Sequence, residues 1–289
     1  MSATLLSILA GLGGMFGWGV SDFFANIASE KLGHSKTVFW SQLAGMIFLG
    51  LLMFFVASGF TLTPSLLGLF IISSICYTVG YVYFYKAFEI GNVSVVSATI
   101  NLNVVVGMAI AFIFKGQRLE GYQPLAIFLI LLGVTLVSLN FKDIFNSKVS
   151  LLAGVKETII ASVVFGAFWN FSETLSEQTG WLPTAFWVKV ISLLLLLVWS
   201  LIQKQSLKYE KKKLGLLPMV ALVGILEAGA VASVNFGLIV GDLVLVSPIS
   251  SALSVVTITL AVIFLKEKLS KIQVLGILTA ISGIVLSAF

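Results

Sequence analysis

Residues 241–288 read GDLVLVSPISSALSVVTITLAVIFLKEKLSKIQVLGILTAISGIVLSA, and residues 91–138 read GNVSVVSATINLNVVVGMAIAFIFKGQRLEGYQPLAIFLILLGVTLVS. The two stretches align without a gap at an offset of 150 positions. Apolar composition raises chance identity, so the comparison depends on shared polar and glycine positions. These are Gly91 with Gly241, Ser97 with Ser247, Gln123 with Gln273, and Gly133 with Gly283. The chain therefore contains an internal repeat, and we expect one unit over 1–140 and a second over 141–289.

The composition indicates a protein that lies in a lipid bilayer. Of its 289 residues, 59% are hydrophobic and 10% are charged, whereas a soluble domain has about 25% charged residues. A spanning helix needs about 20 mainly apolar residues, which leaves room for ten spans and little else. The expected spans are 4–28, 37–57, 65–87, 93–114, 121–139, 152–175, 184–202, 215–238, 243–265 and 270–288. We therefore expect an all-α integral membrane protein of ten transmembrane helices, forming a single membrane domain.

The number of spans determines how the two repeats are oriented. Five spans per repeat is an odd number, so the second repeat must cross the membrane in the direction opposite to the first. Inverted five-helix repeats are typical of secondary transporters, whose substrate site lies near the midplane between the halves. The sequence therefore predicts a transport fold rather than an enzyme fold.

Lysine positions predict the membrane topology. Fourteen lysines flank the odd-numbered loops, whereas Lys115 and Arg118 lie on the other side. The fourteen are Lys31, Lys36, Lys86, Lys142, Lys148, Lys156, Lys204, Lys208, Lys211, Lys212, Lys213, Lys266, Lys268 and Lys271. Because cytoplasmic loops are enriched in Lys and Arg, both termini are expected outside the cell.

Several classes of function are disfavoured by what the sequence contains. The net charge of +5 comes from residues in short loops, where they set topology and touch lipid head groups, so no nucleic-acid partner is expected. One cysteine, Cys76, and one histidine, His34, leave no cysteine framework or metal-ligand pattern. No HExxH, P-loop or nucleophile-elbow motif occurs. We expect no catalytic residue, no metal and no cofactor.

Two acidic residues within spans are the leading functional candidates, because ionisable groups there are costly and usually face the bundle interior. Glu227 lies mid-span, with Asn235 eight residues later near the same face. It binds either a substrate amine or a proton, or it forms a hydrogen bond between helices. Asp22 lies late in the first span, four residues after Trp18. It either lines a cavity wall with Trp18 or lies at the membrane interface, and both acids are candidates for proton coupling.

A second group lies where the sixth and seventh spans meet. Glu173 follows Trp169 and Asn170 by one turn, near the end of the sixth span, and Lys189 lies about two turns into the seventh. These positions are on the same side of the membrane, so an ion pair between Glu173 and Lys189 is geometrically possible. The alternative for Lys189 is that its ammonium group snorkels to the interface along its four-carbon stem.

Further polar positions interrupt the spans. Asn101 in the fourth span aligns with Ser251 in the repeat, which favours a shared position facing the cavity over simple interhelical hydrogen bonding. Tyr81 belongs to a stripe with Tyr77 and Tyr85 at helical spacing, which either packs or offers hydroxyl groups to the cavity. In the first span, Gly13-x-x-x-Gly17 predicts close helix packing.

The second repeat resembles the EamA-type branch of the drug/metabolite transporter (DMT) superfamily. The resemblance rests on Gly241-Asp242-Leu243, Ser247-Pro248, the acidic–basic pair Glu267-Lys268 and a glycine-rich last helix. The first repeat departs from the pattern at Gln117, where the family usually has Glu, and at Ala98, where it has Pro. The resemblance implies a multi-pass plasma-membrane transporter of small metabolites. It also implies termini in the cytoplasm, opposite to the lysine distribution, and we follow the lysines.

These patterns together predict a secondary transporter that exports a small organic solute, amino-acid-like or related, by alternating access through a midplane cavity. The expected partners are the solute, the bilayer and a coupling proton, with a monomer and a homodimer both left open. Two alternatives remain. One is a membrane-embedded enzyme or lipid-handling protein, which would need clustered catalytic groups near an interface. The other is a polytopic scaffold subunit, against which the inverted repeat argues.

Overall fold

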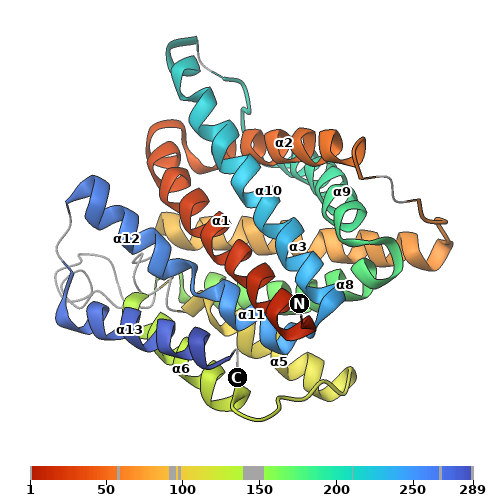
Figure 1. Ribbon diagram of the computed structural model, residues 1–289. Helices are drawn as coiled ribbons and strands as arrows, with labels where there is room; N and C mark the ends of the chain where they lie inside the picture. The colour runs from red at the N-terminus through yellow and green to blue at the C-terminus, as the bar shows by residue number, and fades with distance from the viewer. Residues whose placement is uncertain are drawn as a thin grey trace.

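The computed structural model describes residues 2–56, 59–90, 96, 99–138, 153–209, 211–266 and 269–287. Within these ranges the regular structure is entirely helical (Figure 1). The helices are α1 (Ala3–Leu32), α2 (His34–Met53), α3 (Pro64–Ile90), α5 (Leu102–Phe114), α6 (Gln123–Ser138), α8 (Val155–Thr179), α9 (Trp181–Ile202), the 3-10 helix η1 (Lys211–Leu216), α10 (Leu217–Val240), α11 (Leu243–Ser251), α12 (Leu253–Leu265) and α13 (Lys271–Leu286).

The outer surface of this bundle is apolar and therefore suited to contact with lipid. In the described residues, seven stretches are long and apolar enough to cross a membrane. Three shorter apolar helices, α5, α6 and α13, coincide with the other three predicted spans. Large apolar side chains such as Phe16, Leu51 and Leu201 point outward, which is unfavourable in water. The all-helical membrane fold is confirmed, whereas the count of ten spans stays a prediction.

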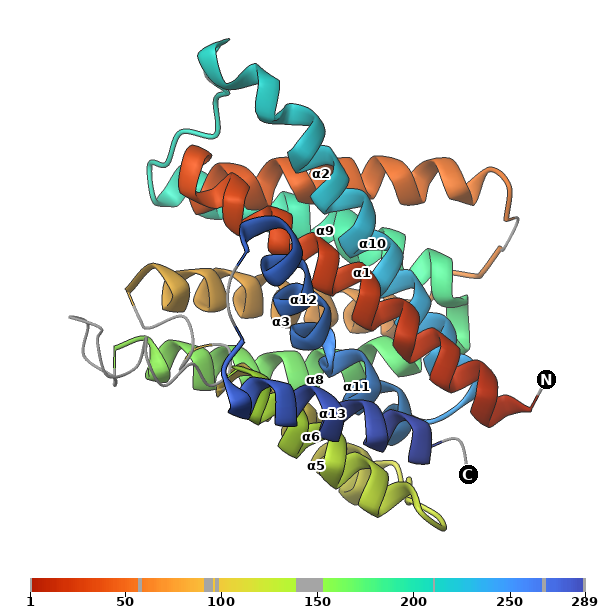
Figure 2. The same cartoon turned by 60° about the vertical axis from the view of Figure 1, so that its left-hand side comes forward.

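Equivalent helices of the two repeats make equivalent contacts. The first helix of each repeat packs along the third helix of the other repeat: α1 packs along α10, and α8 packs along α3. α2 contacts α9, and α6 contacts α13. Figures 1 and 2 show α1 beside α10 and α6 beside α13 in both views. The predicted repeat is thus visible in the packing. Its predicted boundary at 140/141 lies outside the described residues, and the orientation of the halves across a membrane stays a prediction.

Glycines allow these helices to approach closely. A Cβ added to Gly17 of α1 would lie 2.8 Å from the Cβ of Ala230 in α10, so the predicted close packing at this motif is confirmed. Between α2 and α10 the approach is closer still. A Cβ on Gly224 would lie 1.9 Å from the carbonyl oxygen of Ser41. This contact brings the residues that follow, Gln42 on α2 and Glu227 on α10, within reach of one another.

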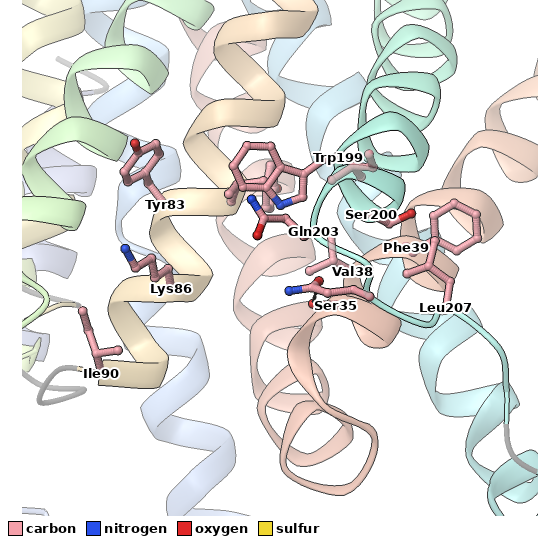
Figure 3. A pocket seen from close by; sticks show the side chains of 14 residues that line it. Ser35, Val38, Phe39, Tyr83, Lys86, Ile90, Trp199, Ser200, Gln203 and Leu207 are labelled. Carbon is pink, nitrogen blue, oxygen red and sulfur yellow. Dashed lines mark hydrogen bonds between the residues drawn. The ribbon is translucent and has the colours of Figure 1, made fainter.

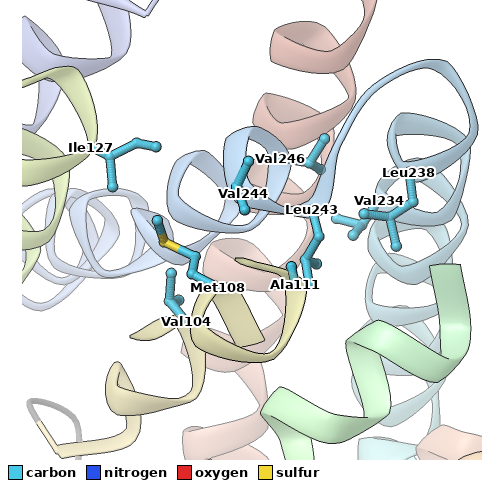
Figure 4. Packing of buried hydrophobic residues seen from close by; sticks show 9 residues of the cluster. All are labelled: Val104, Met108, Ala111, Ile127, Val234, Leu238, Leu243, Val244 and Val246. Atoms are coloured by element: carbon cyan, nitrogen blue, oxygen red, sulfur yellow. The ribbon is translucent and has the colours of Figure 1, made fainter. Parts of the chain in front are cut away.

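The predicted ninth span is not one continuous helix. α11 ends at Ser251, α12 begins at Leu253, and Ala252 between them is fully buried. Pro248 lies inside α11, where its ring removes one backbone donor and clashes with the preceding turn. Such a break is tolerated at membrane depth only when protein surrounds it. Figure 4 shows that side chains from α5, α6 and α10 face those of α11 around this segment.

We predict that Gly224→Ala destabilises the fold, because its methyl group would overlap backbone atoms of α2. Overpacking of this kind costs about 1–3 kcal/mol or more, so the melting temperature in detergent should fall by about 5 °C. The control is Gly229→Ala in the same helix, where an added Cβ meets nothing within 4 Å. Ala is the better helix former by about 1 kcal/mol, so this control should be neutral or stabilising. Equal melting temperatures for the two variants would contradict the close approach.

Candidate functional site

A buried ion pair lies in the interior of the bundle. The ammonium group of Lys189 on α9 donates to Oε2 of Glu227 on α10. Lys189 is 1% exposed and Glu227 is 5% exposed. Removing two charges from water costs several kcal/mol each, and only close pairing with further hydrogen bonds compensates for that cost. The remaining polar atoms of both groups must therefore find partners nearby.

Three side chains from two other helices supply those partners. Tyr77 on α3 donates to Oε1 of Glu227 over 2.6 Å, and Tyr81, one turn later, donates to the same oxygen over 3.1 Å. Oε1 of Gln42 on α2 accepts from Lys189 over 2.6 Å. The hydroxyl oxygen of Tyr77 also lies 3.2 Å from the lysine nitrogen. Four helices thus meet at the group formed by Gln42, Tyr77, Tyr81, Lys189 and Glu227, which we call the central cluster.

Three further candidates lie beside the central cluster. Asp22 on α1 is close enough to Glu227 for their carboxylates to interact electrostatically. Trp18, one turn before Asp22, meets Trp169 of α8 edge to face with 5.5 Å between ring centroids. Trp18 and Trp169 were predicted separately from the first and sixth spans, and the structure brings them into contact.

A cavity of about 460 Å³ lies at one end of the bundle, and Tyr81 of the central cluster is one of the residues that line it. Figure 3 shows it between the ends of α2, α3 and α9. Ser35, Lys86, Gln203 and Gln205 give its wall polar character, and Tyr81 lines it as well. Because Tyr81 also donates to Glu227, one side chain connects the cavity wall to the buried carboxylate. The volume falls within the range of about 300–1,000 Å³ typical of small-molecule sites.

A second ion pair, with a buried carboxylate and a half-buried lysine, joins α8 to the segment after α5. Lys115, just after α5, pairs with Glu173. Oε1 of Glu173 accepts from the side-chain amide of Gln117 over 2.8 Å and from the backbone N–H of Leu243, at the start of α11, over 3.1 Å. Glu173 is 1% exposed. The carboxylate therefore joins the segment after α5 to α8 and to the first turn of α11, and we call Lys115, Gln117 and Glu173 the end cluster.

Neighbouring polar groups complete the end cluster. Lys115 also donates to the backbone carbonyl of Asn170 over 2.9 Å. The side-chain amide of Asn170 donates to the carbonyl oxygens of Gly107 and Gly166, so it joins α8 to α5. Burial, with the carboxylates of Glu173 and Glu120 nearby, raises the pKa of Asp242, and Lys115 opposes this shift. Negative charge is thus concentrated where α11 begins.

Other predicted positions lie outside both clusters. Oδ1 of Asn235 accepts from Ser172 over 2.8 Å, although its helix also carries Glu227. The hydroxyl group of Ser251 donates to the carbonyl of Pro248 in its own helix. Asn101 is half-buried just before α5, and the side chain of Tyr85 lies outside the described part of the structure. Substrate contact therefore stays a prediction for Asn101, Asn235 and Ser251.

The predicted partner of Lys189 was wrong. Glu173 and Lys189 lie near the same turn between α8 and α9, but Glu173 pairs with Lys115 and Lys189 pairs with Glu227. The reason is that α9 presents Lys189 to α10 rather than to α8. Snorkelling does not describe Lys189 either, because its ammonium group is buried and fully engaged.

Four residues of the two clusters were not predicted as site residues, and one of them, Tyr77, was noted only as part of the tyrosine stripe. Gln42 was overlooked although a polar amide in an apolar span is itself a signal. Lys115 and Gln117 were interpreted as loop residues at the end of the fourth span, and nothing local in the sequence indicates their burial against α8. Within the described residues, no group of three or more His, Cys, Asp or Glu side chains is placed to hold a metal ion.

Comparisons with known proteins agree with the repeat. A sequence model of the EamA-like transporter family matches twice, over residues 5–139 and 152–289. One protein of known crystal structure superposes with a TM-score of 0.76 over 97% of this chain and 95% of its own, at 13% sequence identity. That identity supports a shared fold alone. No curated protein sequence matches this chain.

We predict that the two charges of the central cluster depend strongly on each other. Lys189→Met or Glu227→Gln leaves a buried partner uncompensated, which typically costs about 3–5 kcal/mol, so each should lower the melting temperature by about 10 °C. The double variant contains no unpaired charge and should lose much less than the sum of the single losses. Additive losses in this double-mutant cycle would contradict a coupled pair.

Proposed function

This chain belongs to the EamA-like transporter family, and from that premise we propose a secondary transporter that moves an amino-acid-like or related solute by alternating access. Membership of the family indicates a membrane transporter of small solutes rather than an enzyme. The solute class, the direction of transport and the mechanism are our proposals. The multi-pass helical fold agrees with this assignment, and we place the protein in the plasma membrane.

The central cluster is the observation on which the proposal depends. Its ion pair is buried among α2, α3, α9 and α10, and Tyr81, which donates to Glu227, also lines the 460 Å³ cavity. Charged groups buried at membrane depth usually mark a substrate or ion pathway. A carboxylate beside an ammonium group offers complementary partners to a solute that carries both charges. This pairing supports an amino-acid-like solute.

The order of charged and aromatic side chains along α8 supports alternating access. At the cavity end, Lys86 lies 3.4 Å from Glu157 of α8. Toward the middle, Phe165 and Phe168 of α8 contact Tyr81 and Tyr77. Glu173 of the end cluster lies 16 residues beyond Glu157, or about 24 Å along the axis. Lys86 at one end of α8 thus lies on the wall of the 460 Å³ cavity, and the ion pair of Lys115 with Glu173 lies at the other end.

Direction and coupling follow from the same arrangement. The cavity adjoins Lys86 and the lysine-rich helix ends that were predicted to be cytoplasmic. A solute that enters there and leaves past the end cluster would be exported. Asp22 and Glu227 remain our candidates for proton coupling, because their carboxylates are close enough to interact electrostatically and Glu227 pairs with Lys189. A monomer contains both repeats, so a cycle within one chain and a cycle within a homodimer both agree with this proposal.

We predict that a solute of the transported class raises the melting temperature of the detergent-purified protein. Binding only to the folded state stabilises it by mass action. The panel should contain amino acids, sugars, nucleosides and cationic drugs. A stabilising solute should then exchange across proteoliposomes that contain the protein, and Glu227→Gln should abolish both effects. The control is Glu177→Gln, the same substitution at an exposed position of α8, which should retain both.

Different results would favour the alternatives. Exchange that is unchanged in Glu227→Gln would remove the central cluster from the proposed pathway. Chemical conversion of a solute or lipid would favour a membrane-embedded enzyme. A chain that neither binds nor exchanges any solute, but copurifies with a fixed partner, would favour a scaffold subunit.

We predict that locking the end cluster blocks transport but not binding. Lys115→Cys and Glu173→Cys would be introduced on a Cys76→Ser background, which removes the single native cysteine. A short bifunctional thiosulfonate should join the pair and lower solute exchange at least about tenfold, because the end that must open is held closed. The solute should still raise the melting temperature, since it reaches the central cluster from the cavity side.

Reduction of the cross-link should restore exchange. Each single-cysteine variant, treated with the same reagent, reports the effect of modification without a link. Full exchange through a protein that is cross-linked to completion would show that the end cluster does not have to open.

A further inference from the structure

The ammonium group of Lys189 lies among three acceptors that other residues provide. They are Oε2 of Glu227, Oε1 of Gln42 at 2.6 Å and the hydroxyl oxygen of Tyr77 at 3.2 Å. A primary ammonium group has three N–H donors and no acceptor, so each donor has a partner. The Tyr77 ring adds a face whose centroid lies 5.6 Å from the nitrogen. The arrangement is therefore complementary to a primary ammonium group in general, and not only to a lysine.

We propose that Glu227, Gln42 and Tyr77 form a binding site for the primary ammonium group of the transported solute, and that Lys189 occupies this site when the carrier is empty. The inference rests on the proposed transport function and adds the chemical group that the central cluster recognises. Lys189 is then a tethered competitor, which an incoming solute must displace.

The acceptors are held in place independently of Lys189. Oε1 of Glu227 accepts from Tyr77 and Tyr81 on α3, so the carboxylate keeps its orientation when the ammonium group leaves. Gln42 is held near it by the close approach of α2 and α10 at Gly224. The site is therefore built from rigid helices, and withdrawal of one flexible side chain vacates it.

The need for an occupant follows from burial. An empty site would leave the Glu227 carboxylate, 5% exposed, without a positive partner, and an unpaired charge inside a membrane protein is strongly unfavourable. Lys189 supplies that charge from within the protein. The solute's ammonium group can replace it without a change in the net charge at Glu227, while the lysine moves toward the cavity or toward Asp22.

The cavity provides the route and the space for the remainder of the solute. Tyr81 lines the cavity and donates to Glu227, so an ammonium group that passes Tyr81 meets the carboxylate next. Ser35, Gln203 and Gln205 on the cavity wall offer hydrogen-bonding groups to other parts of the solute. A quaternary ammonium ion can contact the Tyr77 ring but has no N–H to donate. The site should therefore reject it.

Chemical rescue of Lys189→Ala tests this inference. The substitution removes the last three carbons and the ammonium group of the side chain, which together have the shape of n-propylammonium. We expect n-propylammonium to raise the melting temperature of the purified variant by at least about 3 °C at saturation. Tetramethylammonium at matched ionic strength should give no shift. Wild-type protein should respond more weakly, because Lys189 competes.

The matched control is the double variant Lys189→Ala, Glu227→Gln, which lacks both the competitor and the carboxylate. It should show no selective response to n-propylammonium. The same shift in the double variant, or an equal shift with tetramethylammonium, would overturn the inference.

A second measurement applies if Lys189→Ala does not fold alone. Purification throughout in n-propylammonium should then yield monodisperse variant, whereas tetramethylammonium should not. If neither does, wild-type protein is titrated with n-propylammonium up to its solubility limit. The absence of any shift beyond that of tetramethylammonium would overturn the inference.

Failure of the inference and failure of the proposed function have different signatures. Rescue by n-propylammonium without exchange of any solute would support the ammonium site and contradict transport. Glu227-dependent exchange of solutes without a primary ammonium group would support transport and contradict the ammonium site.

Discussion

Pairing of Lys189 with Glu227 is the interaction that constrains the interior of this protein most strongly. Both charges are buried, so each must be neutralised where it lies, and the surrounding groups must satisfy the remaining donors and acceptors. Those groups come from α2 and α3, far away in the chain. The helix packing is thus tied to one polar cluster. In the carrier that we propose, a solute with the same charges would take over the contacts of this ion pair.

Ion pairs lie near both ends of α8. Glu157 faces Lys86 near the cavity, and Glu173 is buried with Lys115 at the other end. Trp18 and Trp169 pack against each other between the two repeats. A conformational cycle that closes the first end and opens the second would move the same helices. The end cluster is suited to act as a latch, since a single carboxylate joins α8, the segment after α5 and α11.

The repeat gives this arrangement its symmetry, and the polar residues of the central cluster depart from it. The packing of α1 on α10 is equivalent to the packing of α8 on α3, so the two repeats make the same helix contacts with each other. The charged residues do not follow that rule. Lys189 and Glu227 both belong to the second repeat, whereas Gln42, Tyr77 and Tyr81 belong to the first. Each half therefore contributes a different part of the central cluster.

The sequence by itself determined the helical membrane fold, the repeat and the residues whose burial would be costly. Apolar blocks of membrane length and matching glycines are local properties, and a charge within such a block is visible without a structure. Glu227, Lys189 and Glu173 were recognised in this way. Only the tertiary structure decided which charges meet. Lys189 pairs with Glu227 rather than Glu173, and Gln42 and Lys115 join the clusters, because helix packing sets which faces oppose one another. Periodicity along one helix gives the direction of a side chain but carries no information about the helix that lies across from it.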